Sequence, residues 1–147
     1  MEPAAPSAAT PVPAEGGVRS GDAYAISGMA LSLRGAPYEN GGSDPSGFDC
    51  SGFVWYVFAQ HGIGLPRTVT EQFQLGSHVD EGELRAGDLV FFDTSGAGLS
   101  GARATHVGIS IGGDEFVHAP STRGEVRVER LGSSYWSSRF LEARRVQ

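Results

Sequence analysis

The chain of 147 residues contains 39% hydrophobic residues and carries a net charge of −6, with a mean hydropathy of −0.17. These values indicate one globular domain and, because the acidic chain has no basic stripe, disfavour nucleic-acid binding. No apolar run approaches the ~20 residues that a membrane-spanning helix needs, so we expect no transmembrane segment.

The first residues of the chain differ in composition from the rest. Residues 2–19 are rich in Ala and Pro and show no apolar periodicity, and such a segment cannot bury enough apolar surface to become ordered. We therefore predict a disordered linker or tether over residues 1–21 and one folded domain over residues 22–147. Residues 1–20 also lack the basic start and the apolar stretch of a signal peptide.

Three helices are expected in the first half of the folded domain, over about residues 20–34, 50–61 and 69–76. In the first, apolar residues recur at the spacing of one helix face. Asp49 is a suitable N-cap for the second helix. Thr68 and Glu71 have the spacing of a capping box at the start of the third.

The second half has the patterns of β-strands, expected over residues 88–93, 106–111, 115–119, 124–130 and 140–146. Gly112, Gly113 and Asp114 separate the second strand from the third, which is a hairpin signal. The fourth alternates valines with charged residues, the period of a half-buried strand. Helices followed by an antiparallel sheet predict an α+β domain.

Cys50 is the only cysteine in the chain, so its thiol cannot form an internal disulfide. Most free cysteines are small buried hydrophobic residues, but Asp49, Ser51 and Gly52 are unusual neighbours for a core position. The expected helix start would lower the thiol pKa, because the helix dipole favours negative charge there. These features favour a nucleophile over a core cysteine.

His106 and His118 are the candidate partners of this thiol, because the order Cys, His, polar residue is that of papain-like enzymes. A base must lie within hydrogen-bond reach of the nucleophile, and a third group must orient the base. An odd-numbered hairpin loop would pair His106 with Pro120 and place His118 diagonally on the same face. An even-numbered loop would separate the two histidines unless a bulge intervened.

A zinc site made by Cys50, His106 and His118 is the alternative use of these side chains. Their spacing matches no short-range zinc pattern, and there is no second cysteine. We therefore expect no metal and no other cofactor. His61 and His78 are expected to be solvated surface histidines.

Six segments together resemble the NlpC family of bacterial cell-wall cysteine peptidases, and the resemblance covers most of residues 22–146. The segments, in family order, are Gly35-Ala36-Pro37-Tyr38, Asp49-Cys50-Ser51-Gly52-Phe53, Leu65-Pro66-Arg67-Thr68, Gly87-Asp88-Leu89-Val90-Phe91-Phe92, His106-Val107-Gly108-Ile109 and Val117-His118-Ala119-Pro120. Each is weak alone, but six in order are specific.

The resemblance implies a papain-like α+β core, with N-terminal helices packed on an antiparallel sheet and the nucleophile at a helix start. It also implies hydrolysis of an amide bond in peptidoglycan stem peptides, usually between γ-D-glutamate and a diamino acid. Cys50 would be the nucleophile, His106 the general base and acid, and His118 the group that orients His106. Tyr38 would assist the oxyanion, and two further residues, Asp49 and Ser51, would meet the amine or backbone of the substrate.

The resemblance places such an enzyme in the cell envelope, acting as a monomer on stem peptides. Two other functions remain open: an acyltransferase or another amidase on the same fold, and a non-catalytic wall-binding module. A toxin with a cognate inhibitor, or a phage-tail component held by a scaffold protein, would use the same domain.

Overall fold

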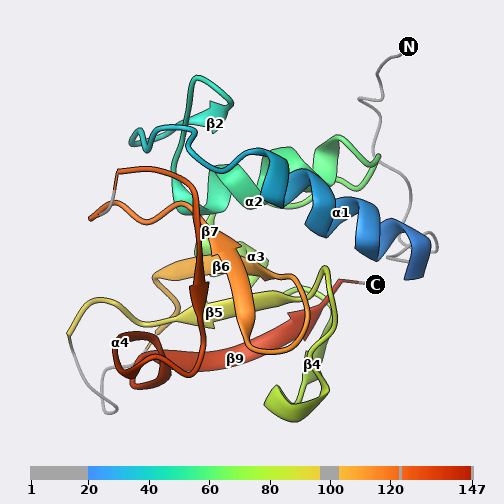
Figure 1. Ribbon diagram of the computed structural model, residues 1–147, viewed down its shortest axis with the longest axis vertical. Helices are drawn as coiled ribbons and strands as arrows, with labels where there is room; N and C mark the ends of the chain where they lie inside the picture. Colours follow the sequence, from blue (N-terminus) through green and yellow to red (C-terminus); the bar gives the residue numbers. More distant parts are fainter. Residues whose placement is uncertain (1–19, 97–102, 123, 147) are drawn as a thin grey trace.

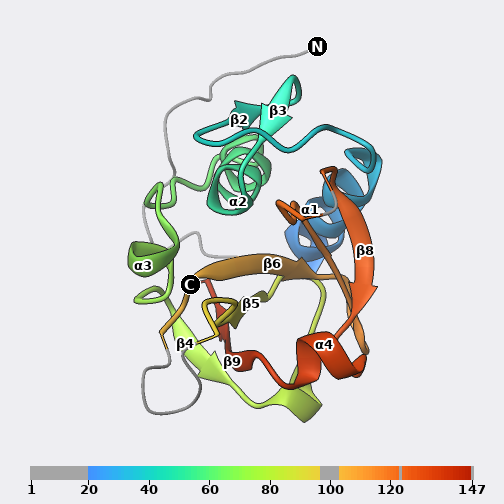
Figure 2. The same cartoon turned by 90° about the vertical axis from the view of Figure 1, so that its left-hand side faces the viewer.

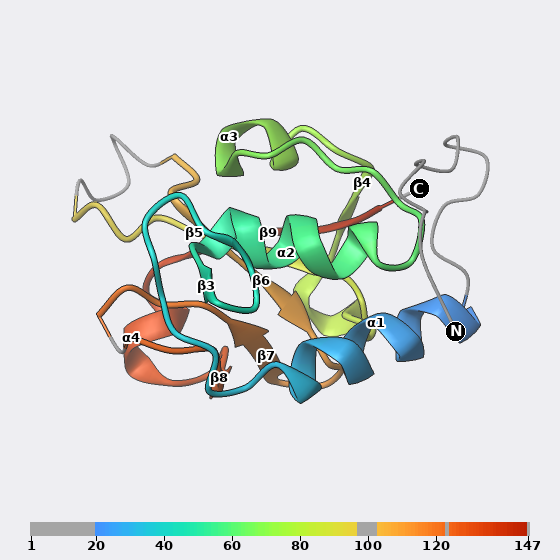
Figure 3. The ribbon, with the colours of Figure 1, turned by 90° about the horizontal axis from the view of Figure 1, so that it is seen from above.

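The computed structural model describes residues 20–96, 103–122 and 124–146. Two helices lie side by side on one face of a six-stranded antiparallel sheet, whose strand order is β4-β9-β5-β6-β7-β8 (Figures 1 and 3). The α+β prediction, helices first and sheet second, is confirmed. The linker predicted over residues 1–21 lies, up to residue 19, outside the described residues.

The first two helices agree closely with the sequence prediction. Helix α1, Ser20–Ser32, buries Ile26 and Ala30 completely. Helix α2, Cys50–Ala59, begins after Asp49, whose side chain accepts a hydrogen bond from the Gly52 backbone N–H at 2.7 Å. One face of α2 is fully buried over the sheet and comprises Phe53, Val54, Val57 and Phe58.

The loop before α2 contains a small hairpin that the sequence pattern did not indicate. Strands β2, Ser43–Asp44, and β3, Gly47–Phe48, pair antiparallel, and Figure 2 shows them above the start of α2. The backbones meet closely, since a Cβ added at Gly52 would lie 1.9 Å from the carbonyl oxygen of Gly42. The hairpin is therefore packed on the helix end that carries Cys50.

Short elements connect α2 to the sheet. Helix α3, Val69–Gln72, is capped by the Thr68 side chain, as the capping-box spacing predicts. Strand β4, Ser77–Val79, then pairs with the last strand, and a 3₁₀ turn, η2, covers Glu81–Glu83. Strand β4 was not predicted.

The other strands lie within the ranges expected from the sequence. They are β5 (Leu89–Phe92), β6 (His106–Ser110), β7 (Glu115–His118), β8 (Arg127–Arg130) and β9 (Phe140–Arg145). In the β6–β7 hairpin Ile109 pairs with Val117 and Ser110 with Phe116. This register places His118 opposite Gly108, so the odd-numbered loop that the triad hypothesis requires is present.

The sheet has a hydrophobic cluster on each face. On the helix-covered face, Val107, Ile109 and Val117 pack against α1 and α2. On the other face, a short helix, α4 (Ser134–Ser137), places Trp136 against Phe92 and Phe116. No helix in residues 20–96, 103–122 and 124–146 combines the length and the hydropathy required to cross a bilayer.

Candidate active site

Cys50 is the first residue of α2, and its thiol reaches the beginning of β6. The backbone N–H of Val107 lies close enough to the Cys50 thiol to lower its pKa, as do the N–H groups of Ser51 and Cys50 at the helix start. Since Val107 directly follows His106, this contact brings the thiol to the strand end that carries the first histidine.

His106 and His118 lie on the same face of the sheet, which is the arrangement that an odd-numbered hairpin loop produces. Nε2 of His106 is 2.7 Å from Nδ1 of His118, and the two rings are nearly perpendicular, at 84°. His118 is completely buried and His106 almost so. Gly108 lies opposite His118 and makes room for it, since a Cβ at Gly108 would be 3.1 Å from the His118 Cβ.

The row of side chains continues beyond the two histidines. Nε2 of His118 is 2.9 Å from Oε2 of Glu129 on β8, and Nε1 of Trp136 donates to Oε1 of the same carboxylate at 3.0 Å. The Trp136 indole also stacks on the His106 ring, with centroids 5.4 Å apart. The sequence pattern of β8, valines alternating with charged residues, did not single out Glu129.

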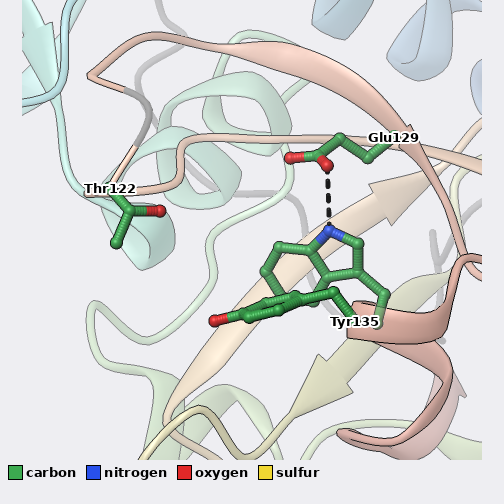
Figure 4. A pocket seen from close by; sticks show the side chains of 4 residues that line it. Thr122, Glu129 and Tyr135 are labelled. Atoms are coloured by element: carbon green, nitrogen blue, oxygen red, sulfur yellow. Dashed lines mark hydrogen bonds between the residues drawn. The ribbon is translucent and has the colours of Figure 1, made fainter.

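A pocket of about 420 Å³ opens beside this row, lined by Thr122, Glu129, Tyr135 and Trp136. Figure 4 shows the Glu129 carboxylate on one side of the opening and Thr122 on the other. Tyr135 is 46% exposed, and the Arg139 guanidinium lies 3.7 Å from the centre of its ring. The pocket gives solvent access to Glu129, whose side chain is 20% exposed.

Burial dominates the electrostatics of the thiol and the first imidazole. It raises the pKa of Cys50 to about 11 and, with help from His118, lowers the pKa of His106 to about 3. The helix start and the Val107 N–H act in the opposite direction on the thiol but do not prevail. The expectation of a lowered thiol pKa is therefore wrong for the free protein, in which burial disfavours the charged form of both groups.

The carboxylate at the end of the row behaves differently. The hydrogen bond from His118 contributes most to lowering the pKa of Glu129, and with the bond from Trp136 it outweighs partial burial and brings the value to about 2. Glu129 is thus an anion at every pH at which the protein is expected to work, in contact with a histidine that has no exposed surface.

The three residues expected near the substrate lie around Cys50. The charges of Cys50 and Asp49 contribute, after burial, to raising the pKa of Tyr38. Asp49 caps α2 and forms a 3.0 Å ion pair with Arg67, which also donates to the Ser51 hydroxyl at 2.8 Å. Contact of Tyr38, Asp49 and Ser51 with substrate stays a prediction, and Arg67 is a part of the site that sequence reasoning did not single out.

The remaining histidines have local partners. Nδ1 of His61 is 2.9 Å from the Val57 carbonyl oxygen, so this half-buried ring is not simply solvated. His78 is exposed and contacts Asp80 and Glu142. Over the described ranges, no group of three or more His, Cys, Asp or Glu side chains is arranged to hold a metal ion.

Comparison with known proteins identifies the family. Residues 35–145 match the model of the NlpC/P60 family. The chain is 41% identical over 116 residues to murein DD-endopeptidase MepH of Escherichia coli K12, covering 76% of this chain and 41% of that one. It is 43% identical over 114 residues to murein DD-endopeptidase MepS/murein LD-carboxypeptidase of the same strain, covering 77% and 57%.

A solved structure agrees with the sequence relatives. The crystal structure of an NlpC/P60 family protein from Bacillus cereus ATCC 10987 matches with a TM-score of 0.78 and 30% identity, covering 87% of this chain and 41% of that one. The chain belongs to the NlpC/P60 family, and both the family and the fold predicted from the six segments are confirmed. It spans about half the length of the two E. coli relatives.

Proposed function

We propose that the protein is a cysteine peptidase that cuts an amide bond in peptidoglycan stem peptides, in the cell envelope. The observation that carries the proposal is the hydrogen-bonded pair His106–His118 at the strand end where the Cys50 thiol meets Val107. A nucleophile, a base and a group that orients the base are the requirements of thiol-based acyl transfer. The names of the two E. coli relatives support peptidoglycan as the substrate.

In this mechanism the Cys50 sulfur attacks the scissile carbonyl carbon while His106 accepts the thiol proton. Because Nε2 of His106 is engaged by His118, Nδ1 is the nitrogen that takes the proton. The tetrahedral oxyanion is stabilised by the Cys50 backbone N–H and the Tyr38 hydroxyl. His106 then returns the proton to the leaving amine, and water hydrolyses the thioester with His106 acting again as base.

A neutral Cys50 thiol and a neutral His106 imidazole fit this mechanism if the proton moves from the thiol to the imidazole while the sulfur attacks. With the thiol pKa at about 11 and that of His106 at about 3, a preformed thiolate–imidazolium pair is disfavoured in the free protein. Charge separation then develops as the carbonyl is attacked, where the oxyanion donors can stabilise it.

Two bonds are candidates for cleavage. The family resemblance points to the bond between γ-D-glutamate and the diamino acid within one stem. The names of MepH and MepS, both murein DD-endopeptidases, favour the bond that joins two stems in a cross-link.

Mass spectrometry of purified muropeptides after incubation with the protein distinguishes these two bonds. An uncross-linked disaccharide tripeptide is cut only at a bond within the stem, whereas a cross-linked dimer becomes two monomers if the bridging bond is cut. Products larger than the substrate would indicate an acyltransferase. If neither substrate is cut and the protein is retained on intact walls, the result would contradict the proposal and favour a wall-binding module. Cys50→Ala is the matched control for each reaction.

A further inference from the structure

Glu129 extends the site beyond the three residues that the sequence identified. We propose that Glu129 is a positioning residue that fixes the protons of both imidazoles, so that the unprotonated nitrogen of His106 faces Cys50. This inference rests on the proposed function. It follows from the continuous row that runs from His106 through His118 to Glu129, with contacts of 2.7 and 2.9 Å.

The ionised Glu129 carboxylate determines where each proton of the row lies. An ionised carboxylate only accepts hydrogen bonds, so the bond to Glu129 requires a hydrogen on Nε2 of His118. A neutral imidazole carries one N–H, which leaves Nδ1 of His118 as an acceptor. Nε2 of His106 must then donate to it, and Nδ1 of His106 is left with a free electron pair. That nitrogen is the one that can accept the thiol proton.

Without an anion at the end of the row, the direction of the bonds is not determined. A neutral side chain that can donate as well as accept allows the reversed arrangement, in which His118 donates from Nδ1 to His106. In that arrangement the proton of His106 lies on Nδ1, and the ring cannot act as the base toward Cys50.

The carboxylate also stabilises the charge that forms when His106 accepts a proton. The charged or titratable groups facing His118 are His106 on β6 and, on β8, Glu129 and Arg127. Glu129 favours protonated His118, whereas Arg127, whose Nε is 3.7 Å from Oε2 of Glu129, opposes it. Of these groups only Glu129 is an anion, and it therefore compensates the imidazolium in a largely buried site.

Trp136 holds the two ends of the row in one geometry. Its Nε1–H occupies the second carboxylate oxygen of Glu129, and its ring stacks on His106. The carboxylate is thus fixed by two donors from different elements, His118 from β7 and Trp136 from α4.

Steady-state kinetics of Glu129→Gln on a muropeptide test the proposal, with Glu115→Gln as the matched control. Glu115 is an exposed carboxylate on the adjacent strand β7. In Glu129→Gln we expect kcat to fall by about 10²- to 10⁴-fold, as when an orienting carboxylate is lost from a triad, with KM nearly unchanged. Glu115→Gln should match the unsubstituted protein. An unchanged kcat in a folded Glu129→Gln variant would overturn the proposal.

Nitrogen-15 NMR of the histidine rings in the unsubstituted protein gives an independent readout. We expect both His106 and His118 to carry their hydrogen on Nε2 at neutral pH, and Glu129→Gln to mix or reverse these tautomers. A hydrogen on Nδ1 of His118 in the unsubstituted protein would overturn the inference even if peptidoglycan is cut. If instead both histidines show the expected tautomers but no peptidoglycan is cut, the result would contradict only the proposed function.

Discussion

The two ends of the site are held by different kinds of contact. At the end that carries Cys50, the contacts are mostly made by the backbone. The start of α2 is capped by Asp49 and covered by the β2–β3 hairpin, with Gly52 against the carbonyl of Gly42. At the base end, buried side chains form a hydrogen-bonded row across β6, β7 and β8. The proposed nucleophile is therefore positioned by close backbone packing, and the proposed base by the protons and charge of its neighbours.

The substitution with the largest expected effect removes the proposed nucleophile without disturbing either kind of contact. Cys50→Ala should reduce kcat by more than about 10³-fold, because no other group can form the thioester. The free energy of unfolding should change little, since Ala suits the first turn of a helix. Muropeptide turnover and thermal unfolding measure the two quantities. Turnover at the unsubstituted rate would show that another residue is the nucleophile.

Gly52→Ala tests the backbone contact at the nucleophile end. The added Cβ would lie 1.9 Å from the Gly42 carbonyl oxygen and 2.8 Å from Oδ1 of Asp49, so the hairpin and the helix start must separate. We expect a loss of about 3 kcal/mol in the free energy of unfolding, together with a fall in kcat.

Gly28→Ala is the control for this glycine change in urea unfolding. It lies inside α1 with nothing within 4 Å of the added Cβ, and alanine should stabilise the helix by about 0.5–1 kcal/mol. Equal effects at the two positions would show that the hairpin is not packed on α2 as described.

Gly108→Ala makes the corresponding change at the base end. Its Cβ would lie 2.9 Å from the Phe116 ring and 3.1 Å from both the His118 Cβ and the Val117 carbonyl oxygen. These contacts are longer than the 1.9 Å contact at Gly52, so the loss of stability should be smaller, about 1–2 kcal/mol. The displaced His118 should nevertheless lower kcat and change its NMR signals. A stability loss greater than that of Gly52→Ala would reverse the comparison between the two ends.

The smallest expected effect is that of pH near neutrality. With pKa values of about 3 for His106 and about 11 for Cys50 in the free protein, kcat/KM should vary little from about pH 6 to about pH 8. It should fall at low pH as the imidazole pair binds a proton and no longer acts as a base. It should fall at high pH as the proton for the leaving amine is lost. A profile of kcat/KM with a steep limb near neutrality would show that these groups are far less shielded from water.

Local sequence signals were sufficient for the elements that carry the three expected residues. The Asp49 cap predicted the start of α2, and Gly112, Gly113 and Asp114 predicted the hairpin but left open whether its loop is odd- or even-numbered. Both depend on neighbours within a few residues along the chain.

Contacts between distant segments were not predictable in the same way. The partner of Glu129 depends on how β8 aligns with β7 across an irregular connection, and Arg67 reaches Asp49 from a different loop. The prediction of a lowered thiol pKa was wrong for the same reason. The helix start is a local feature, whereas the burial that outweighs it comes from the packing of the whole domain.

In the proposed mechanism, the Cys50 thiol attacks a stem-peptide carbonyl with the aid of the His106–His118 pair. Rapid acid quenching during muropeptide turnover, followed by peptide mapping with mass spectrometry, tests it most directly. We predict a transient adduct, with the mass of the acyl fragment, on the peptide that contains Cys50. Turnover that produces no such adduct and continues after the thiol has been alkylated would contradict the account.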